Sequence, residues 1–394
     1  MPKPPVRAIT LGLADSHPLS ATIIQRAKSI LQQASTRYQE AGYEVQVIRL
    51  STRSIFGDLA HWSLSSLINY TRELQKMLDD VDLGFCSLGT APAARPDFDL
   101  QLLDCMPDLL GPSPSLNSTV LLATSEHGIR TEAALPTARV IQRLAQETDE
   151  GFGNFRFAML ACMPPGSPFF PAAYHVGPSS LSIGFQGAGI VTEALRVHGA
   201  DGMQTQDLFQ VTQWIREALQ QQATPALALG QQLTREHEFL FGGIDLSSAP
   251  LGDDSIAAAI ELCGYGPLGS PGTVAVVAAL TAALKSSGLP TCGYCGLMLP
   301  VLEDVVLGQR WTEGRVDVHR LLLYSSVCGT GLDAIPLPGD SSLASIAHLL
   351  LDVATLAHRW NKPLSARLFP VPGKRAGEYT TFTSPYLTNT LIRD

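Results

Sequence analysis

Acidic side chains follow two predicted strands, in loops that are rich in small residues. Asp245 ends the apolar run FLFGGID, and Asp333 lies in GTGLD ahead of Asp340 in PLPGD. Ligands of parallel α/β sheets and barrels bind where the strands end, so carboxylates there can orient a substrate or move a proton. Capping of a helix or turn is the alternative role, strongest for Asp340 and also expected of Asp253 and Asp254.

A pair of acids closes a third apolar run, GLMLPVL. Glu303 can act there as a general acid or base if burial raises its pKa, or it can hold a divalent cation together with Asp245 and Asp333. The alternative is that Glu303 and Asp304 begin a helix and face the positive end of its dipole. We keep Glu303 and Asp245 as candidates for proton transfer, and metal binding stays open.

One histidine and one cysteine are further candidates for chemistry. His175 lies in the aromatic, proline-rich loop PFFPAAYHVG, where it either orients a substrate or satisfies loop hydrogen bonds. Cys328 precedes the strand that carries Asp333, and the glycines after it would let a substrate approach its sulfur. A thiol needs an activating base, and no spacing in the sequence identifies one, so Cys328 is a reserve nucleophile. The redox activity of the CxxC pair Cys292 and Cys295 stays open.

A glycine-rich loop, GYGPLGSPGT, spans residues 264–273. Its first part matches G-x-G-x-x-G, yet a helical run precedes it where the dinucleotide-binding motif requires a strand. Its last part opens an apolar helix expected over residues 274–284, so bare backbone N–H groups would face a bound anion. A tight turn whose glycines permit close packing is the alternative. The substrate-binding candidates in this loop are Ser270, Gly272 and Thr273.

Positive charge is concentrated near the end of the chain, in RLFPVPGKRAGE. This segment carries Arg367, Lys374 and Arg375, and the glycines beside Lys374 indicate a turn. Such a turn could clamp an anionic substrate, and a solvated basic loop is the alternative. Lys374 and Arg375 are therefore candidates for substrate binding.

The composition limits the classes of function. The 394 residues are 45% hydrophobic and 16% charged, with a net charge of −9, which disfavours binding to nucleic acid or to anionic membranes. The most apolar run holds about 12 residues, short of the roughly 18–20 needed to cross a bilayer. The start of the sequence lacks the pattern of a signal peptide, and the seven cysteines are scattered, so we expect a cytoplasmic protein without disulfides. No cofactor is predicted.

Short β-rich runs alternate with helical segments, which predicts an α/β fold. We expect one large α/β domain over residues 1–394, with a possible looser half over 1–150. Helices are predicted over 208–219 and over 343–356. Pro225 should end or kink the first of these helices. About ten strands are expected, over residues 8–11, 45–50, 83–88, 120–124, 155–162, 181–185, 239–246, 297–301, 332–337 and 366–371.

Six of these motifs, taken in order, resemble the uncharacterised UPF0210 family, also called DUF711: PFFPAAYH, FGGIDLSSAP, GSPGT, LPVLED, VCGTGLDAIPLPGD and RLFPVPGK. The resemblance implies a ten-stranded α/β barrel, similar to pyruvate formate-lyase and anaerobic ribonucleotide reductase. It implies no reaction, because the activity of that family is not established. The positions that match the family are His175, Asp245, Glu303, Cys328, Asp333 and Asp340.

The glycyl-radical enzymes of that fold group store a radical on a glycine near the C-terminus and use it through a cysteine on an inner loop. The residues after Gly377 include no glycine. We therefore expect the barrel without the glycyl-radical motif, and a non-radical reaction.

The function predicted from the sequence is an enzyme that acts on a small polar, anionic metabolite by acid–base or cysteine chemistry. The alternative is a regulatory protein that binds a metabolite without catalysis, since the same loops could serve it. A chain of this size and low charge is also expected to form a symmetric homodimer.

Overall fold

The computed structural model describes residues 3–251 and 254–394, so the predicted capping residue Asp253 lies outside the described part. The strands are β1 (Val6–Gly12), β2 (Ile48–Ser51), β3 (Cys86–Ala91), β4 (Leu116–Thr124), β5 (Gly128–Ile129), β6 (Phe157–Ala161), β7 (Ser180–Phe185), β8 (Leu240–Asp245), β9 (Gly331–Pro338) and β10 (Leu364–Val371). The α-helices are α1 (Ala21–Glu40), α2 (Ile55–Asp58), α3 (Leu64–Asp79), α4 (Met106–Leu110), α5 (Ala134–Glu147), α6 (Ala188–Val197), α7 (Leu208–Glu236), α8 (Ile256–Leu262), α9 (Thr273–Lys285), α10 (Val305–Thr312), α11 (Val318–Val327) and α12 (Leu343–Trp360). Three 3₁₀ helices are η1 (Leu100–Cys105), η2 (Thr131–Ala133) and η3 (Asp149–Arg156).

The strands form one ten-stranded mixed sheet with the order β8-β7-β1-β2-β3-β4-β6-β10-β9, in which β5 pairs only with β4. Strands β1, β2, β3, β4 and β6 run parallel to their neighbours in this order. The pairs β7–β8 and β9–β10 are also parallel, whereas β1–β7 and β6–β10 are antiparallel. The sheet therefore consists of a parallel half that is flanked on both edges by strands of the opposite direction.

An irregular segment, residues 291–300, lies between the two ends of this sheet. Isolated parallel bridges link Thr291 to Ile244 of β8 and Pro300 to Asp333 of β9. A third bridge joins Leu297 to Ser248 just beyond β8. Because the segment contacts both end strands, it completes a ring around the interior, although regular strand pairing does not extend through it.

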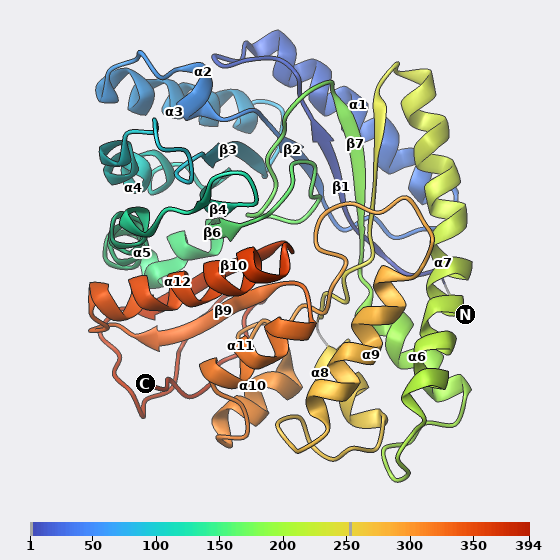
Figure 1. Ribbon diagram of the computed structural model, residues 1–394. Helices are drawn as coiled ribbons and strands as arrows, with labels where there is room; N and C mark the ends of the chain where they lie inside the picture. Colours follow the sequence, from blue (N-terminus) through green and yellow to red (C-terminus); the bar gives the residue numbers. More distant parts are fainter. Residues whose placement is uncertain (1–2, 252–253) are drawn as a thin grey trace.

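Helices surround the strands on the outside (Figure 1). The main hydrophobic core contains buried residues from every part of the chain, from Val6 in β1 to Leu368 in β10. In the described residues, no helix combines the length and the apolar character needed to cross a membrane.

The predicted α/β fold with ten strands is confirmed. Nine predicted strands match β1–β4 and β6–β10, and the tenth, at 297–301, falls at the end of the irregular bridging segment. The two-residue strand β5 was not predicted.

Helix α7 continues through Pro225, so of the two predicted outcomes, a helix end or a kink, the helix end is wrong. Burial of an apolar stripe along both halves of α7 outweighs the loss of one backbone hydrogen bond there. Of the cap candidates Asp340, Ser341 and Ser342, Ser342 accepts the N-cap hydrogen bond of α12, whereas Ser255, and not the predicted Asp254, accepts that of α8.

The glycine-rich loop over 264–273 forms the tight turn that was considered as its alternative role. Gly269 has a φ of 99°, and a Cβ atom built there would lie 2.1 Å from the carbonyl oxygen of Arg315. Gly266 also has a positive φ, of 89°, but its nearest neighbour would be the Ser270 side chain at 3.1 Å. A side chain is therefore excluded at Gly269 by a neighbouring backbone as well as by the conformation.

These two glycines allow a matched test of the turn. We expect Gly269→Ala to lower the free energy of unfolding by roughly 1–3 kcal/mol more than Gly266→Ala, because both replacements strain a left-handed backbone but only the first meets a fixed carbonyl. Urea denaturation of both variants measures the difference. Equal losses would mean that Gly269 is required by its φ angle alone.

Candidate functional site

A cavity of about 70 Å³ lies inside the ring of strands. Residues from both halves of the sheet line it, among them Arg49 of β2, Ala158 of β6 and Arg367 of β10. The bridging segment contributes Tyr294 and Met298. Further lining residues come from the loops at 169–172 and 249–250, so the cavity draws on segments far apart in the sequence.

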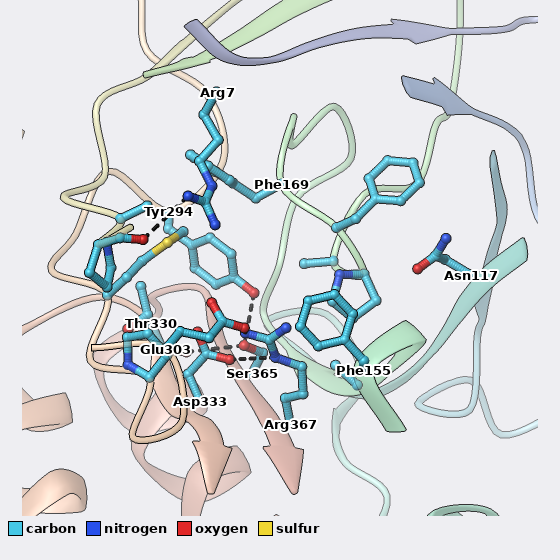
Figure 2. Close-up of a pocket in the computed structure, with 18 of the residues that line it drawn as sticks. Arg7, Asn117, Phe155, Phe169, Tyr294, Glu303, Thr330, Asp333, Ser365 and Arg367 are labelled. Atoms are coloured by element: carbon cyan, nitrogen blue, oxygen red, sulfur yellow. Dashed lines mark hydrogen bonds and ion pairs between the residues drawn. The ribbon is translucent and has the colours of Figure 1, made fainter. Parts of the chain in front are cut away.

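Arg367 occupies the centre of the polar part of the cavity (Figure 2). Its Nε donates a hydrogen bond to Asp333 Oδ1 at 2.7 Å, and its Nη2 lies 2.7 Å from Glu303 Oε1. The three side chains are 7%, 15% and 11% exposed, respectively. The guanidinium also lies over the ring of Phe155, 5.0 Å from its centroid. One buried cation is thus shared by two carboxylates and stacked on an aromatic ring.

Burial and charge act in opposite directions on this cluster. Burial raises the pKa of Glu303, and the positive charge of Arg367 opposes that rise without cancelling it. For Arg367, burial disfavours the charged form, but the charges of Asp333 and Glu303 outweigh it and raise the pKa of the guanidinium. Glu303 therefore combines an elevated pKa with a place in a cavity, as a general acid or base requires.

Two more arginines, Arg7 of β1 and Arg49 of β2, line the same cavity. Burial lowers the pKa of both, that of Arg49 to about 9. Among the described residues neither forms an ion pair with a carboxylate, in contrast to Arg367. The cavity therefore contains one arginine that is paired with carboxylates and two that, among the described residues, are not.

The bridging segment is fixed beside the cavity by Asp245. This carboxylate is fully buried, and it accepts backbone hydrogen bonds from Ser247, Tyr294 and Cys295 at 2.9–3.0 Å. The hydroxyl of Ser247 donates a fourth, at 2.6 Å. Tyr294, held in this way, donates its hydroxyl to Ser365 Oγ at 2.8 Å inside the cavity.

Of the residues predicted from the sequence, the structure places Glu303 and Asp333 together in the cavity. Asp245 lies behind it, in contact with the backbone of Tyr294. The helix-start interpretation applies to Asp304, which accepts the N-cap hydrogen bond of α10, and not to Glu303. The remaining candidates do not line this cavity: His175, Cys328, Asp340, Ser270, Gly272, Thr273, Lys374 and Arg375.

The distant candidates have local partners. The imidazole of His175 is buried, and its Nε2 faces the carbonyl oxygens of Gly177 and Pro178 at 3.2 and 2.9 Å. Asp340 lines a surface groove at the start of α12. Thr273 Oγ1 accepts a hydrogen bond from the Gly269 backbone within its own turn.

Cysteine chemistry gains little support from these surroundings. Cys328 is buried, its Sγ lies 3.3 Å from the Leu297 carbonyl oxygen, and burial raises the pKa of its thiol. Burial also raises the pKa of Cys292 and of Cys295, the latter to about 12. All three thiols thus favour the protonated form, which is a poor nucleophile.

The acids proposed as metal ligands are occupied otherwise. Glu303 and Asp333 share the Arg367 cation, and Asp245 is saturated by N–H and O–H donors. Over residues 3–251 and 254–394, no three His, Cys, Asp or Glu side chains gather as a metal site would require.

Arg7 and Arg49 were not among the residues predicted from the sequence. Each lies in a short apolar strand segment, VRAITLG and IRLS. A charged residue in a strand that is otherwise buried is the signal that could have identified them, because such a residue must face a polar interior. Arg367 in LSARLFPV follows the same pattern.

Residues 2–384 match the profile of a family described as "Uncharacterised ACR (DUF711)". The chain belongs to the DUF711 family. The UPF0210 protein PAE3581 of Pyrobaculum aerophilum is 31% identical over 402 residues, which cover 95% of this chain and 86% of that protein. A UPF0210 protein of Carboxydothermus hydrogenoformans is 26% identical, with 99% and 90% covered.

Among solved structures, the anaerobic ribonucleotide reductase from Thermotoga maritima in complex with dATP and CTP overlaps with 98% of this DUF711 chain and 81% of its own. The TM-score is 0.40 and the sequence identity is 10%. The predicted UPF0210/DUF711 membership is confirmed, and the family is uncharacterised.

Removal of the shared cation should destabilise this DUF711 protein in a pH-dependent way. Arg367→Met leaves two buried carboxyl groups uncompensated, and we expect it to lower the free energy of unfolding by about 3–5 kcal/mol at neutral pH. Without Arg367 the folded-state pKa of Glu303 rises further above its unfolded value, so stability falls as the pH rises through that interval. The loss should therefore be smaller near about pH 4, where carboxyl groups begin to protonate.

Urea denaturation at both pH values tests this expectation. The control is Arg72→Met, which replaces an exposed arginine of α3 and should change stability by less than about 0.5 kcal/mol. An Arg367→Met loss that is the same at both pH values would show that packing, and not charge compensation, is its main contribution.

Proposed function

We propose that the cavity binds a small anionic metabolite and that Glu303 transfers a proton to or from it. The observation that carries the proposal is the juxtaposition of Glu303 with three arginines, Arg7, Arg49 and Arg367, in one enclosed space. The three guanidinium groups exceed the two carboxylates of the cavity, Glu303 and Asp333, in charge. An anionic ligand would neutralise the excess.

The roles within the site follow from the contacts. Arg367 and Asp333 would hold the Glu303 carboxyl in place, because the guanidinium links both acids. The aromatic side chains of Phe155, Phe169 and Tyr294 would limit access of water, which strengthens the electrostatic interactions inside. Glu303 would act as acid or base on the bound anion, with an apparent pKa above that of an ordinary carboxyl group.

A metabolite screen can test binding and catalysis separately. We expect small anions to raise the melting temperature of both the wild-type protein and Glu303→Gln, because the amide keeps the shape of the site. Incubation of each hit with the wild type should convert it, whereas Glu303→Gln should be slower by roughly 10²–10⁴-fold.

The matched control is Glu73→Gln, which replaces an exposed carboxylate on α3 and should retain wild-type activity. If every hit stabilises the wild type but is recovered unchanged, the cavity belongs to a metabolite-binding protein without catalysis. If Glu303→Gln converts the hit as fast as the wild type, Glu303 is not the proton-transfer group.

We further propose that the chain forms a symmetric homodimer in the cytoplasm. The apolar side chains of Met203 and Phe209 are 85% and 72% exposed, and a subunit interface would cover such surface. Light scattering at micromolar concentration should give twice the mass of the chain. A monomeric mass would contradict the proposal.

A further inference from the structure

The donors of Arg7 and Arg49 are poorly satisfied within the described part of the protein. Arg7 Nη1 donates to the Pro250 carbonyl oxygen and Arg49 Nη1 to that of Pro168, each at 3.3 Å. Both distances exceed the usual length of an N–H···O hydrogen bond. The Nε of Arg49 is buried and has no acceptor among the described residues. A buried donor without an acceptor is costly, so a ligand oxygen at this position would be favourable.

Aromatic rings fix the orientation of Arg49. Its guanidinium lies over Phe85 and over Phe170, with 5.3 and 5.1 Å to the two ring centroids. The two rings meet edge to face, 6.3 Å apart. Contacts with the faces of the guanidinium leave the N–H groups along its edge, which is the geometry for binding carboxylate or phosphate oxygens.

The positive charges of Arg7 and Arg49 repel one another. Burial lowers the pKa of Arg49 to about 9, and the positive charges of Arg7 and Arg367 lower it in the same direction. Arg49 nevertheless stays charged at neutral pH. The charge of Glu303 raises the pKa of both arginines and so relieves part of their repulsion, and a ligand would relieve the rest.

We propose that Arg7 and Arg49 together bind a compact dianion, either two carboxylates of one small molecule or a single phosphate group. The inference rests on the proposed anion-binding function of the cavity and states its substrate class. Both guanidinium groups have donors without good acceptors, and the oxygens of a dicarboxylate or a phosphate can accept from both groups at once more fully than those of a single carboxylate. Glu303, on the bridging side of the cavity, is then left to act on the rest of the molecule.

Isothermal titration calorimetry with four small probes tests the proposal. Malonate and succinate represent dicarboxylates, inorganic phosphate represents a phosphate group, and acetate represents a single carboxylate, all at one ionic strength. At least one dianion should bind the wild-type protein about tenfold or more tightly than acetate. Whether a dicarboxylate or phosphate gives the heat decides between the two sources of charge.

Variants assign the binding to the two arginines. Arg7→Gln and Arg49→Gln should each weaken binding of that dianion by about tenfold or more, whereas Arg72→Gln on the surface of α3 should not. Arg49→Lys keeps the charge but loses the flat donor edge, so its affinity should lie between those of the wild type and Arg49→Gln. This variant keeps the test valid if Arg49→Gln does not fold.

The outcomes separate this inference from the proposed function. Acetate that binds as tightly as every dianion would overturn the dianion proposal but leave an anion-binding cavity. If malonate, succinate and phosphate all fail to bind while the metabolite screen still yields a converted monoanion, the dianion proposal is likewise overturned and the anion-binding cavity remains. Failure of all four probes together with an empty screen would overturn both.

Discussion

A cation buried between two carboxylates, Arg367 with Asp333 and Glu303, is the interaction on which the interior of this protein depends. Removing Arg367 would leave two carboxylates without a cation in a region that excludes most water. The partners come from β10, β9 and the chain just after the bridging segment, so the cluster ties that segment to the β9–β10 end of the sheet. Charge compensation therefore supports one of the two junctions of the ring.

The closure itself uses few regular hydrogen bonds. The segment at 291–300 contacts β8 and β9 through isolated bridges rather than ladders. Asp245 supplies what the ladders do not, since its two carboxylate oxygens accept four hydrogen bonds and fix the turn that carries Tyr294. This irregular wall brings the hydroxyl of Tyr294 into the cavity, and it is free of the strict alternation that fixes side-chain direction in a regular strand.

The cavity joins two kinds of cation. Arg367 is satisfied by carboxylates, whereas Arg49 is held by the faces of Phe85 and Phe170 and, among the described residues, donates only one long hydrogen bond, to the Pro168 carbonyl oxygen. A satisfied cation serves structure, and one that is positioned without an anionic partner is ready for a ligand. The same space thus contains an arginine paired with carboxylates and an arginine that, under the proposed function, would bind the ligand.

The sequence by itself determined the α/β fold, nine of the ten regular strands and the family, because apolar periodicity and contiguous motifs are local properties of the chain. It also identified Glu303 and Asp333 as candidates at strand ends. It could not bring them together with Arg367, Arg7 and Arg49, because these five residues lie far apart in the chain and meet only when the strands form a ring. A charge in an otherwise apolar strand marks Arg7 and Arg49 in the sequence, but it does not show which groups they meet. The tertiary structure likewise assigned Asp245 to the backbone of Tyr294 and His175 to its own loop. Which polar groups share a low-dielectric cavity is decided by strand register and ring closure, and no local pattern encodes those.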